Sequence, residues 1–137
     1  MAALSQTPAS VIPASGSSKT TVTAGGTITA GMPVYKDTAD SNKYKPSRAN
    51  AAGTSACNGI ALTGSSNGQP LVIHTGGGIN LGGTLVVAET YCVSDAVAGQ
   101  IVPIGDLGAT DYPVIIGMAT TASNLAYEVI NPGVAKP

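Results

Sequence analysis

The feature that most constrains this chain is the recurrence of short β-branched and aliphatic runs between glycines and prolines, roughly every 8–12 residues from about residue 21 onward. Val, Ile and Thr favour extended backbone, and runs this short fit strands better than helices. With 18 Gly and 9 Pro among 137 residues, few stretches could continue as a helix. We therefore expect an all-β fold, a small sandwich or barrel of short strands.

The apolar residues are small, which limits what the core can be. Hydrophobic residues make up 43% of the chain, yet Phe and Trp are absent and there are five Tyr. Val, Ile, Leu and Ala must fill the interior, which suits thin, closely packed β layers better than a large ligand pocket. Charged residues make up 9%, against about 25% in ordinary domains. A surface so poor in charge suits a subunit held in an assembly better than a free monomer, whose solubility usually depends on charge.

Several classes of function are disfavoured by charge and hydropathy. The net charge of −1 argues against nucleic-acid binding, which requires a basic face. No apolar run approaches the roughly 18 residues that a membrane-spanning helix needs. The first residues lack the basic and apolar regions of a signal peptide. We expect a protein kept inside a cell, or in a particle assembled there, with no membrane or nucleic-acid partner.

The amino-terminal segment, residues 1–20, reads as a flexible arm attached to a single β domain at 21–137. Its mixture of Pro, Ser, Ala and Gly has no sustained period and favours extended or disordered chain. Two interpretations stay open: the arm orders on a partner, for example by adding a strand to a sheet edge, or it is a frayed terminus. The candidate partner-binding residues are Leu4, Val11, Ile12, Thr20 and Val22.

Within the domain we expect strands at 20–23, 27–29, 34–36, 60–62, 71–75, 84–87, 91–93, 101–104, 114–119 and 126–130. Asn67-Gly68 predicts a type I′ hairpin turn. The glycines at 76–78 are expected to end the strand before them, and residues 119–124 could hold one helical turn.

The sequence also contains an internal echo. Residues 28–35 match residues 85–92 at a shift of 57, and residues 59–63 match 117–121 at a shift of 58. Two related β units, about 21–75 and 79–131, would fold onto each other because neither can bury both of its faces alone.

Residue types that carry enzyme chemistry are sparse. His74 is the only histidine, and its place in an alternating strand favours a structural role. Cys57 and Cys92 are expected to be buried free thiols. The Gly76–Gly78 run lacks the following helix of a phosphate loop, so a close backbone approach explains it better. The acidic pairs Asp37/Asp40 and Asp106/Asp111 suit local turns. We expect no catalytic residues, no metal and no cofactor.

Taken in order, four motifs resemble one family. Residues 26–35 follow the pattern G-x-I-x-A-G-x-x-V-Y, and residues 58–62, 68–73 and 116–119 follow at fitting intervals. The pattern is similar to that of small bacteriophage capsid decoration, or cement, proteins over roughly residues 22–131. In the second unit Ala88-Glu89 replaces the expected Gly-x, which departs from the symmetry of the two units.

The resemblance implies a β-barrel or β-tulip-like fold and a homotrimer on the capsid exterior. Such a protein would bridge subunits of the major capsid protein and stabilise the head, with an N-terminal arm that pairs with capsid strands. It would be a virion component assembled in the host cytoplasm. The alternatives are another phage structural module, from a tail or fibre, and a carbohydrate-binding or enzymatic β domain.

Overall fold

A computed structural model describes residues 4, 6–135 and 137 of the chain. The all-β expectation is confirmed: the described residues contain ten β-strands, two single 3₁₀ turns and no α-helix. The elements are η1 Pro8–Ser10, β1 Ile12–Pro13, β2 Ser18–Thr23, β3 Pro33–Asp37, β4 Lys43–Pro46, β5 Gly59–Ala61, β6 Pro70–Asn80, β7 Thr90–Val93, β8 Ile101–Pro103, η2 Ile104–Asp106, β9 Ile115–Ala119 and β10 Asn124–Ile130.

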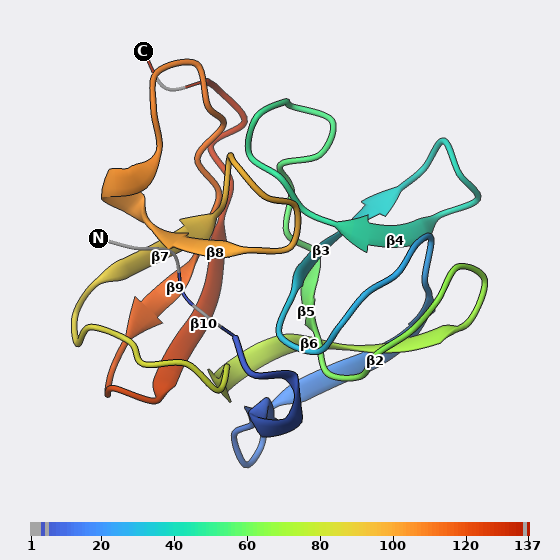
Figure 1. The fold of residues 1–137 in the computed structure, drawn as a ribbon, viewed down its shortest axis with the longest axis horizontal. Helices are drawn as coiled ribbons and strands as arrows, with labels where there is room; N and C mark the ends of the chain where they lie inside the picture. Colours follow the sequence, from blue (N-terminus) through green and yellow to red (C-terminus); the bar gives the residue numbers. More distant parts are fainter. Residues whose placement is uncertain (1–3, 5, 136) are drawn as a thin grey trace.

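Eight of the strands form one antiparallel sheet that curls into a half-barrel (Figure 1). The order across the sheet is β4-β3-β5-β6-β10-β9-β7-β8. Both halves have the same connectivity. In each half the first two strands form a hairpin at the edge of the sheet, the third strand pairs with the first, and the fourth strand lies at the centre. We call β3–β6 the first unit and β7–β10 the second unit.

The two units also share loop hydrogen bonds at equivalent positions. The segment before the first strand of each unit is bonded to the segments around its third strand in the same way. The matching N–H···O bonds are Ile28–Ser65 (2.9 Å) with Leu85–Ala122 (2.8 Å), Gly31–Ala61 (2.8 Å) with Ala88–Ala119 (2.8 Å), and Ala61–Met32 (2.8 Å) with Ala119–Glu89 (3.0 Å).

Strand β6 joins the two units because its two ends pair with different partners. Its first part pairs with β5 and β2, and its last part pairs with β10 and β1. The glycines at 76–78 therefore do not end the strand as expected; β6 continues through them to Asn80. Neighbouring strands on both edges supply the backbone partners that offset the poor strand propensity of glycine. A register shift where β6 meets β2, opposite Ser18 and Lys19, marks a bulge just before the glycines.

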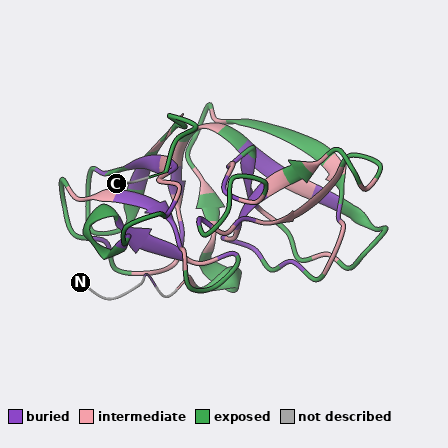
Figure 2. Ribbon diagram, turned by 90° about the horizontal axis from the view of Figure 1, so that it is seen from above, coloured by how far each residue is buried: buried purple, intermediate pink, exposed green. Residues whose placement is uncertain are grey.

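Two hydrophobic clusters fill the interior, and Figure 2 shows buried stretches at both ends of the molecule. The larger cluster combines most of the second unit with Leu4, Ala49, Cys57 and Ile60. The smaller one belongs to the first unit and contains Ile28, Val34, Leu71 and Ile73, among others. Most side chains in both clusters are aliphatic, as the lack of Phe and Trp requires, and Tyr91 is the aromatic member of the larger cluster.

Some local expectations were wrong. No strand forms at residues 84–87: residues 84–86 have no regular structure and residue 87 begins a turn. Val86 and Val87 are exposed, because Leu85 alone is drawn into the core. Residues 27–29 make an isolated bridge at Ile28 and no strand, and residues 119–124 contain no helical turn. The predicted turn at residues 67–68 is present, but only Gly68 has a positive φ, of 84°. A type I′ turn needs two such residues, so the turn is of another type.

The equivalent positions Gly31 and Ala88 both have left-handed backbone, with φ of 93° and 66°. Left-handed backbone costs a non-glycine residue about 1–2 kcal/mol, and Ala88→Gly removes that cost but gives the unfolded chain more conformational entropy. The net effect that we expect is a rise of about 0.5 kcal/mol in the free energy of unfolding. The matched reverse change, Gly31→Ala, should lower it by about 2 kcal/mol. Urea unfolding of both variants measures this, and a loss in both would contradict the equivalence of the two turns.

Candidate functional site: the N-terminal strap

Residues 4 and 6–17, here called the strap, run along the β domain and contact both units. The Leu4 amide donates to the Ile101 carbonyl on β8 at 2.8 Å, and the Thr7 amide donates to Leu81 at 3.1 Å. Farther along, the Ala14 amide donates to the Gly78 carbonyl at 2.8 Å. These bonds hold the strap at three separated points.

The strap differs from the expected free arm in two respects. The boundary expected between residues 20 and 21 falls inside β2, which spans Ser18–Thr23 and pairs with β6 throughout. In the structure the described residues before it also lie on the domain. The physical reason is that β6 has an edge free for β2, and the apolar side chains of Leu4 and Val11 have a core to enter.

Three glycines with positive φ make room for the strap. A Cβ at Gly82 would lie 2.6 Å from the Thr7 carbonyl oxygen, and one at Gly77 would lie 3.0 Å from Ser17 Cβ. At Gly31 a Cβ would lie 3.1 Å from both Gln6 Cβ and a Val11 methyl group. The close backbone approach expected at Gly76–Gly78 is thus confirmed, and the segment that approaches is the strap itself.

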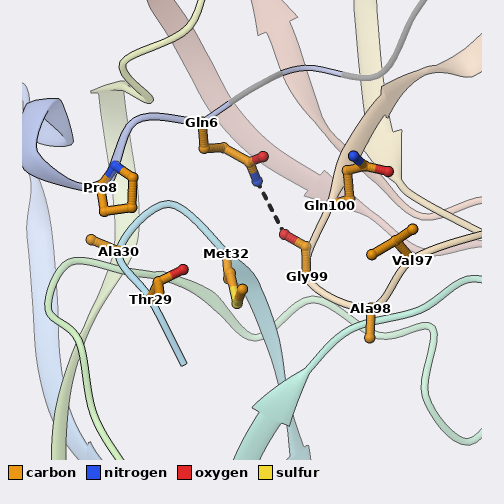
Figure 3. A pocket seen from close by; sticks show the side chains of 9 residues that line it. All are labelled: Gln6, Pro8, Thr29, Ala30, Met32, Val97, Ala98, Gly99 and Gln100. Atoms are coloured by element: carbon orange, nitrogen blue, oxygen red, sulfur yellow. Dashed lines mark hydrogen bonds between the residues drawn. The ribbon is translucent and has the colours of Figure 1, made fainter. Parts of the chain in front are cut away.

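Gln6 ties the strap to both units at once. Its side-chain amide donates to the Gly31 carbonyl before β3 and to the Gly99 carbonyl before β8, each at 3.0 Å. Gln6 lines a hollow of about 230 Å³. Figure 3 shows Gln6 above this hollow, with Met32 on one side and residues 97–100 on the other. Sequence reasoning missed this residue, because one glutamine in a Pro- and Ser-rich segment carries no pattern.

The five residues predicted to bind a partner do not form one surface. Leu4 is 5% exposed and belongs to the larger cluster, which Val11 also contacts. Val22 is half-buried against the smaller cluster. Only Ile12, at 60% exposed, and Thr20 face outward. In this conformation Leu4 is available to a partner only if the strap lifts from the domain.

His74, Tyr127 and Cys57 meet where the two units join. The His74 Nε2 lies 2.7 Å from the Gly77 carbonyl, and the His74 ring contacts the Tyr127 ring edge-on at 5.2 Å. Cys57 Sγ lies 3.8 Å from the Tyr127 hydroxyl. Burial raises the pKa of Tyr127 above its usual value and that of Cys57 to about 11. The raised pKa values keep Cys57 and Tyr127 protonated near neutral pH, so neither is activated as a nucleophile.

The charged groups are engaged in local structure. Lys45 Nζ lies 2.7 Å from an Asp37 oxygen and 3.1 Å from Asp40, and the hydrogen bond from Lys45 lowers the pKa of Asp37. Asp37 also accepts from the Ala39 amide at 3.0 Å, and Asp111 accepts from Gly108 at 2.7 Å. The Asp37 contact, with the amide two residues on, is the expected Asx turn, whereas Asp111 accepts from the amide three residues before it. Within the described part of the chain, no three His, Cys, Asp or Glu residues gather as a metal site.

No protein-family model, curated protein or solved structure matches the chain. Among the described residues there is also no helix of the length and hydropathy required to cross a membrane.

Replacing Gln6 should loosen the strap without unfolding the domain. Gln6→Ala removes two hydrogen bonds worth about 1–2 kcal/mol together, so the Leu4 and Thr7 amides should exchange with solvent roughly tenfold faster. Hydrogen exchange measured by NMR provides the test. Gln100→Ala is the matched control, because Gln100 lines the same hollow and its side chain makes no hydrogen bond to a described residue. Unchanged exchange in Gln6→Ala would contradict the anchoring role.

The two thiols should be unreactive in the folded protein. Both are free and buried, and burial raises the pKa of Cys57 to about 11 and that of Cys92 to about 12. Near neutral pH an Ellman titration should find little reaction until the protein is denatured, and then two thiols. Because the folded pKa values lie above the ordinary 9.0, stability should fall as the pH rises above 9. Rapid reaction of the native protein would contradict the burial.

Proposed function

We propose that this chain is a decoration protein of a phage capsid, a non-enzymatic virion component that binds the outer surface of the head and bridges subunits of the major capsid protein. The observation that carries the proposal is the strap, whose apolar side chains are held on the domain at a few separated points. The order of the motifs resembling the family, and the low charge of the surface, support it.

Release of the strap would supply both parts of a strand-pairing contact. The strap itself offers Leu4, Val11 and Ile12 to a capsid strand. At the same time the Ile101 carbonyl loses its hydrogen-bond partner, so the edge of β8 at this point is free to pair with another strand. Adding an extended segment to such an edge combines backbone hydrogen bonds with side-chain pockets. The bonds that hold the strap closed are then replaced on the capsid, so the protein exchanges one set of contacts for another.

We also propose that the two units are related halves of a β-tulip-like domain and that the protein acts as a homotrimer. The shared connectivity, the matching loop hydrogen bonds and the shift of 57–58 residues support the relation of the halves. Trimerisation would place three straps on neighbouring capsid subunits, and several weak contacts made together bind far more tightly than one.

The test is binding to heads of the tailed phage that carries the gene, after the heads have been stripped of this protein. Cryo-EM of decorated particles should show its density on the outer head lattice. Density on the tail would favour the alternative of a tail or fibre module, and no binding to any part of the particle would reject the proposal.

Leu4→Ala tests the role of the strap in that assay. It removes the deepest side chain of the strap, and we expect weaker binding to heads together with a stability loss of about 2 kcal/mol. Leu107→Ala is the control: Leu107 is also buried in the larger cluster, at 3% exposed, but lies outside the strap. Equal head binding by the two variants at matched folded fraction, measured by co-sedimentation, would remove the strap from the proposal.

A further inference from the structure

An apolar surface lies on the outer side of the second unit, across β7, β9 and β10. Met118 is 48% exposed there and Ile130 is 53% exposed. With five neighbours they line a shallow hollow of about 330 Å³, and the seven lining residues are Thr90, Ile115, Gly117, Met118, Ala126, Glu128 and Ile130. Glu128 is the only charged residue among them. We call these residues the outer face.

The outer face continues onto the strap. Ala126 is opposite Gly78 and Asn124 is opposite Asn80, so these positions of β6 and β10 lie on the same side of the sheet. Asn80 is in turn opposite Ile12 on β1. Because directly paired residues of antiparallel strands project to the same side, Ile12, which is 60% exposed, extends the outer face by a further strand.

The first unit contains the equivalent surface, and there it is buried. The cross-strand row Thr90–Met118–Ala126 of the second unit corresponds to the row Pro33–Ile60–His74 of the first. Pro33 is buried, and Ile60 and His74 are fully enclosed.

The second unit is what covers that row. The His74 ring packs against Tyr127 of β10, and Ile60 belongs to the same cluster as Leu125 and Ile116. Inside one chain, therefore, this side of the four-strand unit is covered by another unit of the same connectivity. The corresponding side of the second unit has no such cover among the described residues.

We infer that the outer face is the surface on which a second copy of this chain docks. A second copy supplies a further four-strand unit of the kind that covers the row in the first unit. The nearly uncharged composition suits repeated contacts between identical chains, since no like charges cluster there. The inference rests on the proposed self-association and names its surface.

Met118→Glu tests it, because a carboxylate would then be buried beside Glu128 in the contact. Sedimentation equilibrium from micromolar to high micromolar concentration should show an oligomer for the unmodified protein and at least tenfold weaker association for the variant. Val97→Glu is the matched control: Val97 is 53% exposed but lines the hollow beneath Gln6. A monomeric unmodified protein, or a Met118→Glu variant that associates normally, would overturn the inference.

A second variant, Ile130→Glu, keeps the test decisive if Met118→Glu does not fold, and thermal unfolding identifies that case. Head binding separates this inference from the proposed function. If the unmodified protein is monomeric and Met118→Glu still abolishes binding to heads, the outer face contacts the capsid, so this inference fails while the proposed function stands. If Met118→Glu is monomeric and its copies bind heads with reduced affinity, both are supported.

Discussion

The structure depends on one strand, β6, being shared by two units that could not bury their surfaces separately. Its first part completes the first unit and its last part pairs with the second unit. The bulge before the glycines lets the same strand serve two sheet directions. As a result, Ile60 and Cys57 of the first unit enter the cluster built mainly by the second. Without this shared strand, each unit would be a small curved sheet with an uncovered apolar side.

The strap depends on β6 as well, since it is seated where that strand carries glycine. Gly77 and Gly78 bring the backbone of β6 close to residues 14–17, and Gly82 does the same for Thr7 just beyond the strand. Gln6 then spans the loops before β3 and β8. The strap thus joins the two units, and its contacts with them are few enough for a partner to compete with them.

The predictions that the structure confirms are those in which a local rule is also the physical cause of the structure. Alternating β-branched residues, the Asx turn at Asp37 and buried thiols each follow from the chemistry of neighbouring residues. The predictions that were wrong concern segments whose structure is set by contacts with residues distant in the sequence. Residues 84–87 are strand-like in composition but form no strand, because Leu85 alone enters the core. The glycines at 76–78 stay in a strand because both edges of β6 are paired.

The all-β class, the largely aliphatic core and the repeated short motifs follow from the amino-acid sequence, because they depend on side-chain shape and spacing. Only the tertiary structure decided where the N-terminal segment lies and which side of each unit is covered. Leu4 is buried because a core within reach accepts it, and Ile60 is enclosed while the equivalent Met118 is exposed. Equivalent residues differ in burial because burial depends on what packs against them, and no local pattern encodes that.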